Sequence, residues 1–170
     1  QLLLRHFADV NVGAVAGNVK IGNQRNLLTK WQSIEYVSSQ NFERNAFAYI
    51  NAITVVPGAI GIFRRSVIIE SGGFTGDTVA EDCDLTIRIL KAGYRVSNEP
   101  GAIAITEAPE TITMFLRQRF RWNFGTMQSL WKNKDALFNP AFGSLGWIAL
   151  PNILIFQLFI PLLAPITDLI

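Results

Sequence analysis

The chain has 170 residues, with 15 Lys and Arg, 13 Asp and Glu and a net charge of +2, which excludes the concentrated basic surface of a nucleic-acid-binding protein. Hydrophobic residues make up 49% and charged residues 16%, and this composition excludes a disordered chain and a surface of ordinary polarity. Cys83 and His6 are the only residues of their types, so a disulfide framework, a cysteine zinc cluster and a multi-histidine metal site are excluded as well.

Apolar periodicity predicts strands that alternate with helices, which favours an α/β fold. Small and β-branched residues between glycines indicate strands, and apolar residues three or four apart indicate helices. In chain order we expect a strand at 12–19, a helix at 27–50, a strand at 53–63 interrupted at Pro57-Gly58, a helix at 81–92 ended by Gly93, short strands at 94–96 and 102–106, and a long helix at 109–131.

An uncharged segment of 23 residues runs from Leu145 to Thr167 and is long enough to span a bilayer as a helix. A buried core helix is the alternative, although such helices are usually shorter. We therefore predict a domain at 1–142 and a transmembrane segment at 143–170. Basic residues before this segment place the domain in the cytoplasm by the positive-inside rule. Because the chain begins within a predicted helix and ends in an apolar run, we interpret it as part of a longer protein.

The helix predicted at 81–92 begins in an acidic stretch. Thr78 and Glu81 have the spacing of a capping box, in which the acidic residues only stabilise the helix start. Helical geometry places Asp84 and Arg88 on a common face, which we expect to be solvated, and Asp82 on the inward face. Burial favours the protonated carboxyl and the helix dipole favours the charged one, so Asp82 is a candidate general base.

Asp82 and Asp84 also form a D-x-D pattern, a common signature of metal and sugar-nucleotide sites. On a helix, however, residues two apart point about 200° away from each other. We therefore do not expect these two carboxylates to bind one metal ion.

The long helix at 109–131 has two distinct faces. We expect an apolar stripe to pack in the core, and the opposite face to carry Gln118, Arg121 and Trp122, with Gly125 one turn further on. A guanidinium suits phosphate oxygens and an indole offers a flat stacking surface. The alternative is a solvated face with an amphipathic Trp near a membrane. The expected core stripe consists of Leu116, Phe120, Phe124, Met127 and Trp131.

These motifs together resemble the processive membrane glycosyltransferases of family 2, which include cellulose, chitin, hyaluronan and poly-N-acetylglucosamine synthases. The resemblance rests on Ala80-Glu81-Asp82, where the family has a hydroxyl residue before Glu-Asp, and on the later Q-x-x-R-W motif. Pro57-Gly58-Ala59 also resembles a segment that lines the acceptor site in the family. Within this family, the sequence is most similar to poly-N-acetylglucosamine or chitooligosaccharide synthases. The Q-x-x-R-W motif reads Gln118-Arg119-Phe120-Arg121-Trp122.

The resemblance implies the C-terminal half of a GT-A domain that transfers a sugar, N-acetylglucosamine above all, from a UDP-sugar to a growing β-linked polysaccharide with inversion. Asp82 would accept the proton of the acceptor hydroxyl, Gln118 and Arg121 would hold the diphosphate, and Trp122 would stack on the acceptor. The further substrate-binding residues would be Glu81, Arg119, Pro57, Gly58 and Ala59.

The resemblance also implies a divalent cation, Mg or Mn, whose ligands would lie upstream of this chain, with no metal ligand in the chain itself. It further implies a multi-pass protein of the inner cell membrane with possible accessory export subunits, and a chain that is inactive by itself. Two enzyme alternatives are a cellulose- or hyaluronan-type synthase and a non-processive transferase acting on a lipid carrier, although such transferases often lack Q-x-x-R-W. The alternative from another class is an inactive, membrane-anchored module.

Overall fold

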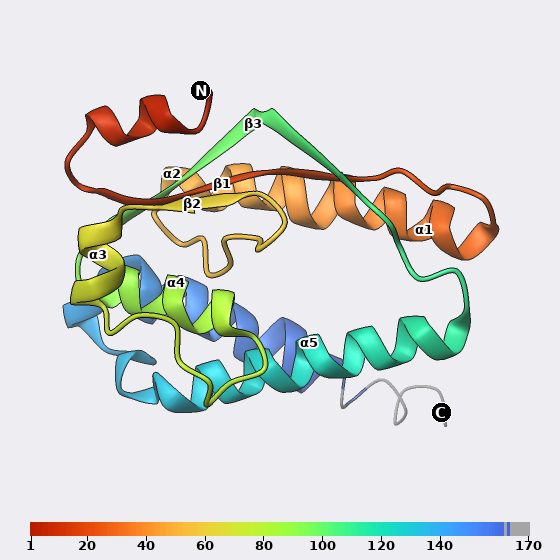
Figure 1. Ribbon diagram of the computed structural model, residues 1–170. Helices are drawn as coiled ribbons and strands as arrows, with labels where there is room; N and C mark the ends of the chain where they lie inside the picture. The colour runs from red at the N-terminus through yellow and green to blue at the C-terminus, as the bar shows by residue number, and fades with distance from the viewer. Residues whose placement is uncertain (162, 164–170) are drawn as a thin grey trace.

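The computed structural model describes residues 1–161 and 163, without the side chains of residues 39 and 40. Its centre is a three-stranded sheet in the order β2-β1-β3 (Figure 1). The middle strand β1 (Val12–Ile21) is antiparallel to β2 (Gly61–Phe63) and parallel to β3 (Arg95–Thr106). Small and β-branched side chains of β1 are almost entirely buried, so the strand expected at 12–19 is confirmed.

The other strand predictions need correction. Of the strand expected at 53–63, only β2 forms, because Pro57 has no backbone donor and the chain before it runs as an irregular segment. The strands expected at 94–96 and 102–106 are parts of one strand, β3. Its pairing with β1 shifts where Gly17 faces Glu99 and Asn18 faces Ile103. Residues 100–102 therefore bulge out, which explains the interruption in the sequence pattern.

The helices expected at 27–50, 81–92 and 109–131 are confirmed, and local signals fix their ends. Asn26 and Thr29 form a reciprocal capping box at the first helix. Gly93, at φ +86°, follows the helix at 81–92 in the left-handed region that favours glycine. The helices are α1 (Leu27–Glu35), a π segment (Tyr36–Glu43), α2 (Arg44–Tyr49), α3 (Arg65–Glu70), α4 (Glu81–Lys91) and α5 (Ile112–Lys132).

The start of α4 differs from the capping box that we expected. Ala80 is the N-cap residue and no side chain caps this helix. The Oγ1 atom of Thr78 is buried and has no hydrogen-bond partner among the described residues. The capping-box prediction is therefore wrong, and the acidic residues at 81–84 are not explained by it.

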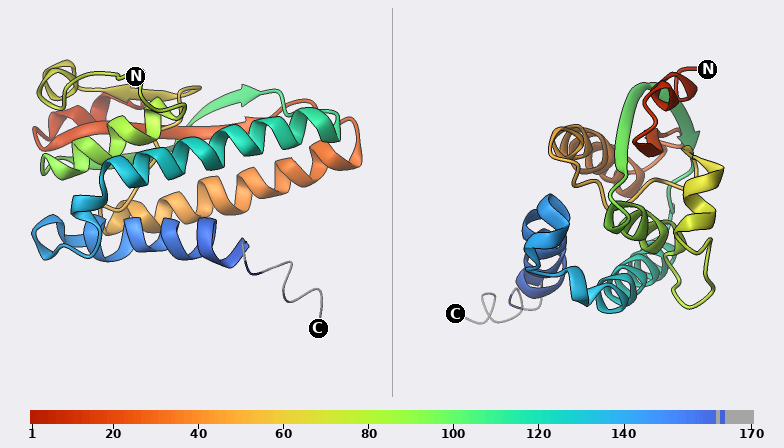
Figure 2. Two further views of the ribbon diagram at one scale, coloured as in Figure 1. Left: turned by 90° about the horizontal axis from the view of Figure 1, so that it is seen from below. Right: turned by 90° about the vertical axis from the view of Figure 1, so that its left-hand side faces the viewer.

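The main core lies between the sheet, α4 and the C-terminal helical run (Figures 1 and 2). α4 contributes Leu85, Ile87 and Ile89, each with no exposed surface. After α5 the chain continues through two 3₁₀ turns, Lys134–Ala136 and Pro140–Phe142, into that run. The C-terminal run consists of Leu145–Ala149, α6 (Leu150–Asn152) and Ile153–Phe159.

The C-terminal run covers part of the expected transmembrane segment at 143–170. Leu145, Ala149, Leu150 and Ile153 are buried in the main core. Within residues 1–161 and 163, no helix is both long and apolar enough to cross a bilayer. Residues 162 and 164–170 of the expected segment lie outside the described residues. The transmembrane segment and the domain boundary before it therefore stay predictions.

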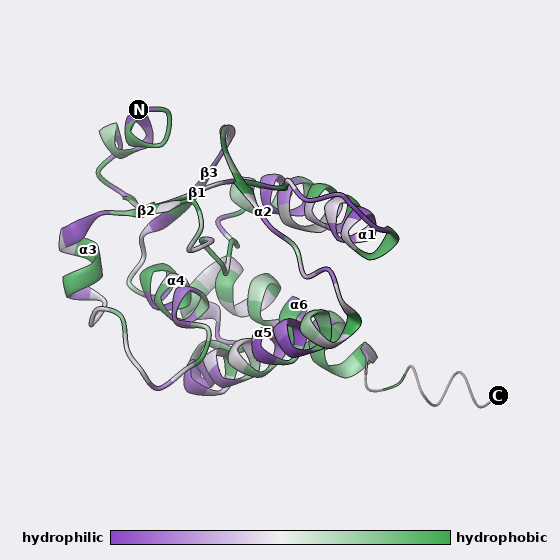
Figure 3. Cartoon of the chain, turned by 45° about the vertical axis from the view of Figure 1, so that its right-hand side comes forward, coloured by the Kyte–Doolittle hydropathy of each residue, from purple (hydrophilic) through white to green (hydrophobic). Residues whose placement is uncertain are grey.

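The apolar stripe of α5 does not face the core. Its side chains are between 41% and 72% exposed, and the alternation of hydrophilic and hydrophobic residues along this helix is visible in Figure 3. The prediction that this stripe packs in the core is wrong, because the buried residues of α5 are Gly125, Ser129 and Leu130 instead. The exposed stripe consists of Leu116, Phe120, Phe124, Met127 and Trp131.

Candidate active site

A cavity of about 830 Å³ opens between the helices. One wall is the helical run 27–49, and another is formed by the start of α4 together with α5; Figure 2 shows these helices running past one another. The segment 52–59, the C-terminal run, Val19, Thr106 and Glu107 also line the cavity. Most of the residues that sequence motifs singled out line this one cavity, namely Pro57, Gly58, Ala59, Asp82, Gln118, Arg119, Arg121 and Trp122.

Asp82 lies in the first turn of α4 and is half-buried at the cavity. Burial raises the pKa of its carboxyl, and the neighbouring charge of Glu81 adds to this effect. The backbone N–H of Cys83 donates to Oδ1 over 2.8 Å, and this bond and one from the backbone of Gly58 lower the pKa in part. Asp82 thus has the inward position that we expected and a raised proton affinity, both suited to a general base.

Glu81 takes a different position from its neighbour. Its side chain is exposed and is not part of the cavity lining. Within the described residues its effect on the site is electrostatic, through the pKa of Asp82. A direct contact between Glu81 and a substrate stays a prediction.

The motif residues of α5 form the facing side of the cavity. Gln118, Arg121 and Trp122 all line it, as their common helix face predicts. Trp122 also packs against the small buried cluster of Val19, Ile21, Tyr36 and Ala108. Arg121 is exposed, so its guanidinium is accessible to a ligand. This wall combines a cationic fork with an apolar ring, which suits a phosphate beside a sugar.

Arg119 has partners within the protein. Its Nη1 and Nη2 atoms donate to the two carboxylate oxygens of Glu35 over 2.5 and 2.7 Å. The guanidinium lies 4.9 Å from the ring centres of both Phe115 and Trp122. Arg119 therefore joins α5 to α1 and supports Trp122, and its predicted contact with substrate stays a prediction.

Arg44 is a cavity residue that the sequence analysis missed. It is 9% exposed at the start of α2, and its Nη1 atom donates to the carbonyl of Gly17 over 3.2 Å. Burial lowers the pKa of its guanidinium to about 10. No sequence motif marked it, since the apolar spacing of this run indicated a helix but not which side chains are buried, and Trp31 and Phe42 are mostly exposed.

Asp84 is also placed differently from the prediction. We expected it on a solvated face, but its side chain has no exposed surface. Its neighbours in space come from α5 and from the loop before α4, which periodicity along one helix cannot reveal. Asp82 therefore lies at the cavity, whereas Asp84 is buried among protein donors.

The described residues do not form a metal site. In the part of the chain that the structure describes, no group of three or more His, Cys, Asp or Glu side chains is arranged to hold a metal ion. Asp84 is already bound by protein donors, so the D-x-D pair at 82–84 offers no shared ion site. No residue of this cavity is assigned to a metal.

Comparison with known proteins gives a consistent result. The model of glycosyl transferase family group 2 matches residues 1–169. The chain is 32% identical over 117 residues to the poly-β-1,6-N-acetyl-D-glucosamine synthase of Staphylococcus aureus, covering 69% of this chain and 28% of the synthase. It is 35% identical over 125 residues to a probable glycosyltransferase of Bacillus subtilis, covering 73% of this chain and 30% of that protein. The chain thus spans under a third of the length of these relatives.

A solved structure supports the fold. A mannosyltransferase from Pyrobaculum calidifontis, solved in complex with GDP-Man and Mn²⁺, matches with a TM-score of 0.62 at 22% identity. The match covers 88% of this chain and 40% of the mannosyltransferase. The expected α/β fold of the GT-A type is therefore confirmed.

Proposed function

Because the chain belongs to glycosyl transferase family group 2, we propose that it carries the acceptor-side half of the active site of an inverting glycosyltransferase. The donor is a UDP-sugar, N-acetylglucosamine above all, and the acceptor is the end of a growing β-linked polysaccharide. The likeness to a poly-N-acetylglucosamine synthase over 69% of the chain supports this choice of sugar. A cellulose- or hyaluronan-type synthase and a non-processive transferase acting on a lipid carrier are the enzyme alternatives.

The observation that carries the proposal is the position of Asp82. Its carboxyl lies in a cavity whose facing wall bears the Q-x-x-R-W side chains, and its pKa is raised by burial. In the proposed reaction Asp82 accepts the proton of the acceptor hydroxyl while that oxygen forms a bond to C1 of the donor sugar. The bond from C1 to the diphosphate oxygen breaks on the opposite side, and the configuration at C1 inverts.

The other cavity residues act by binding. Gln118 and Arg121 donate hydrogen bonds to the leaving diphosphate, which carries the negative charge that develops in the reaction. Trp122 presents its ring to the acceptor sugar. Gly58 and its two neighbours form the facing side of the acceptor site. Arg119 and Glu81 contribute from the edge of this arrangement.

The proposal includes a divalent cation, Mg or Mn, as in the mannosyltransferase solved with Mn²⁺. When bound, such a cation neutralises diphosphate charge. Its ligands are not assigned among the residues described here. We also propose that the full-length protein is a multi-pass protein of the inner cell membrane, with its catalytic domain in the cytoplasm and with accessory export subunits as possible partners.

The test uses the full-length protein and its incorporation of sugar into polymer. Asp82→Asn should abolish incorporation, because Asn is nearly isosteric but cannot accept the proton. Asp135→Asn is the matched control, since Asp135 is an exposed residue whose partner is Lys91, and it should retain activity. Trp122→Ala should shorten the polymer. Full activity of Asp82→Asn would overturn the catalytic role of Asp82, whereas no incorporation by the unmodified full-length protein would favour the inactive, membrane-anchored module.

The donor is identified in the same assay. We expect incorporation from UDP-N-acetylglucosamine and little from UDP-glucose or GDP-mannose. Incorporation from UDP-glucose alone would replace the proposed sugar by that of a cellulose-type synthase. Addition of a single sugar to a lipid acceptor, with no longer product, would replace processive synthesis by the lipid-carrier reaction.

A further inference from the structure

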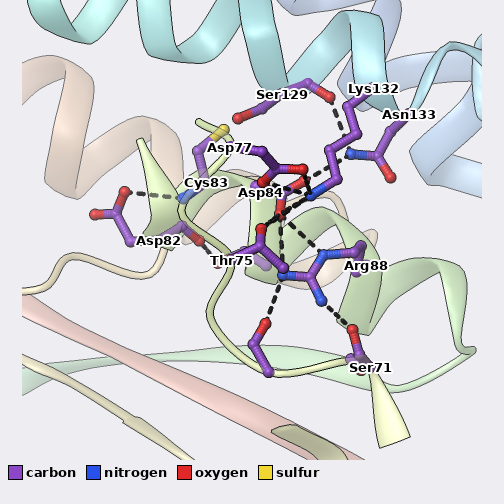
Figure 4. Close-up of polar contacts among 12 residues, drawn as sticks. Ser71, Thr75, Asp77, Asp82, Cys83, Asp84, Arg88, Ser129, Lys132 and Asn133 are labelled. Carbon is purple, nitrogen blue, oxygen red and sulfur yellow. Dashed lines mark hydrogen bonds and ion pairs between the residues drawn. The ribbon is translucent and has the colours of Figure 1, made fainter. Parts of the chain in front are cut away.

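Two residues after Asp82, the carboxylate of Asp84 is completely buried and is bound by four side chains (Figure 4). Lys132 Nζ and Arg88 Nε each donate to its Oδ2 atom over 2.9 Å. Thr75 Oγ1 donates to Oδ2 over 3.2 Å, and Asn133 Nδ2 donates to Oδ1 over 3.1 Å. We call these five residues the Asp84 cluster.

The Asp84 cluster joins three segments that are distant in sequence. Asp84 and Arg88 belong to α4, Thr75 belongs to the loop before α4, and Lys132 and Asn133 lie at the end of α5. The loop is held a second time, because Lys132 also donates to Asp77 over 3.0 Å and to Thr75 over 2.9 Å. The cluster therefore fixes the end of α5 against the first turns of α4.

Arg88 extends the cluster to the turn at 71–73. Its Nη1 atom donates to the carbonyl of Ser71, and its Nη2 atom donates to the carbonyl of Gly73 over 2.7 Å. Four residues of the loop between α3 and α4 are thus held by Asp84 or by its partners Arg88 and Lys132, namely Ser71, Gly73, Thr75 and Asp77. This loop leads directly into Asp82.

A second line of contacts runs along α5 toward the cavity. A Cβ atom at Gly125 would lie 2.6 Å from the Cβ of Ala80 and 2.7 Å from its backbone nitrogen, so the helix backbone touches the N-cap of α4. One turn later, Gln128 Oε1 accepts from the backbone N–H of Val79 over 3.0 Å. Together with the Asp84 cluster, these contacts set the spacing between α5 and the residues that precede Asp82.

The charge of Asp84 is balanced inside the protein. Burial alone would raise the pKa of its carboxyl, but hydrogen bonds and charges from Lys132 and Arg88 outweigh burial and hold the pKa below its usual value. A buried carboxylate with its donors satisfied is a rigid connection, and loss of its charge removes the buried anion that Lys132 and Arg88 share.

We propose that Asp84 is a positioning residue that fixes α5, and with it Gln118, Arg121 and Trp122, at the working distance from Asp82. This inference rests on the proposed function. Asp84 itself is not among the residues that line the cavity, so it acts through α5 and the loop before α4. A displacement of about 1 Å between reacting groups can cost about a hundredfold in rate.

Loosening of this connection should also change the environment of Asp82. If α5 moves away from Ala80, water reaches the start of α4 and the effect of burial on Asp82 decreases. The pKa of Asp82 should then fall toward the ordinary carboxyl value. Of the other charged groups around Asp82, Arg119 and Arg121 move with α5 in such a variant. Burial has the largest effect on the pKa of Asp82 and decides the direction of its change. The groups that stay in place are Glu81 on α4, Glu35, Glu43 and Arg44 of the helical run 27–49, and Glu107 from the loop before α5.

The experiment measures kcat/KM against pH for the full-length protein with UDP-N-acetylglucosamine as donor. Asp84→Asn removes the charge at nearly constant shape and should lower the maximal kcat/KM by tenfold to about a hundredfold, mainly through kcat. Its acidic limb should lie at lower pH than that of the unmodified protein. Lys132→Met, a milder change at a partly exposed residue, should move both quantities in the same direction.

Asp135→Asn is the matched control. Asp135 is another Asp that accepts from a Lys, since Lys91 of α4 donates to it over 2.8 Å, but Asp135 is exposed. This variant should leave the pH profile unchanged. A purely structural role of Asp84 would reduce the amount of active protein and leave the acidic limb in place. An unmoved limb in both Asp84→Asn and Lys132→Met would therefore overturn the proposal.

The two proposals fail in distinguishable ways. If Asp82→Asn keeps full activity, the catalytic role of Asp82 that carries the proposed function is wrong. If Asp82→Asn is inactive while Asp84→Asn and Lys132→Met keep the unmodified pH profile, only the positioning role is wrong.

Discussion

Replacement of Gly125 by alanine inserts one methyl group where α5 touches the residue that precedes α4. The new Cβ would lie 2.6 Å from the Cβ of Ala80, and an ordinary contact begins at 3.4 Å, so a shift of about 0.8 Å is needed. The nearest atoms are a Cβ and backbone atoms of residues 79 and 80, which cannot rotate away. Overpacking of this kind costs about 1–3 kcal/mol.

Helix propensity opposes this cost. Alanine is about 1 kcal/mol more favourable than glycine inside a helix, so we expect Gly125→Ala to lose about 1 kcal/mol on balance and about 2–4 °C in Tm. The rate of transfer should fall more steeply than the stability, by up to about a hundredfold, because the shift separates the Q-x-x-R-W residues from Asp82.

Thermal unfolding and sugar incorporation by the full-length protein test both effects. Gly76→Ala is the matched control, because a Cβ there meets nothing within 4 Å and Gly76 is not among the glycines with positive φ. It should change neither quantity. If Gly125→Ala were as stable and as active as the unmodified protein, the contact between α5 and Ala80 would not set the geometry of the site.

Two further predictions concern charged residues of the cavity. Burial raises the pKa of Asp82 in the folded protein, so the stability that the protonated carboxyl contributes is lost as pH rises through that pKa. Asp82→Asn should therefore have a higher Tm than the unmodified protein at neutral pH and no advantage below about pH 4. A Tm difference that is constant with pH would contradict this. Arg119→Met and Glu35→Gln should be coupled by about 0.5–1 kcal/mol in a double-mutant cycle of unfolding free energies, since both carboxylate oxygens accept from the guanidinium, and additive effects would show that the pair does not form in solution.

The fold was predictable where a local signal determines the structure. β1 is a run of small and β-branched residues, and α4 ends at a glycine with φ +86°. The strand pairing was not predictable in the same way. β3 reads as two strands because residues 100–102 bulge out where its register with β1 shifts, and this bulge depends on the partner strand rather than on the residues alone.

The site was predictable where a motif carries it and not where contacts across the fold create it. Asp82 and Trp122 were identified from their motifs, and both line the cavity. Asp84 belongs to the same acidic stretch, yet its partners Lys132 and Asn133 lie 48 and 49 residues further along the chain. Arg44 stands in a helical run in which apolar residues such as Trp31 and Phe42 are mostly exposed, and no motif or spacing in the sequence singled it out.

The reversed faces of α5 explain why its apolar stripe was wrongly predicted to pack in the core. The inward residues recur every three or four positions and form one continuous stripe: Gln118, Arg121 and Trp122 line the cavity, Gly125, Gln128 and Ser129 contact residues 79 and 80, and Lys132 and Asn133 bind Asp84. Hydrophobic periodicity assigns the apolar stripe of a helix to the core, because the core is the usual packing partner of a helix in a globular protein. In α5 the inward side faces the cavity at one end and the Asp84 cluster at the other, and it carries polar and small side chains at both. Under the two proposals, one face of α5 would both bind the substrate and set the distance between its bound groups and Asp82.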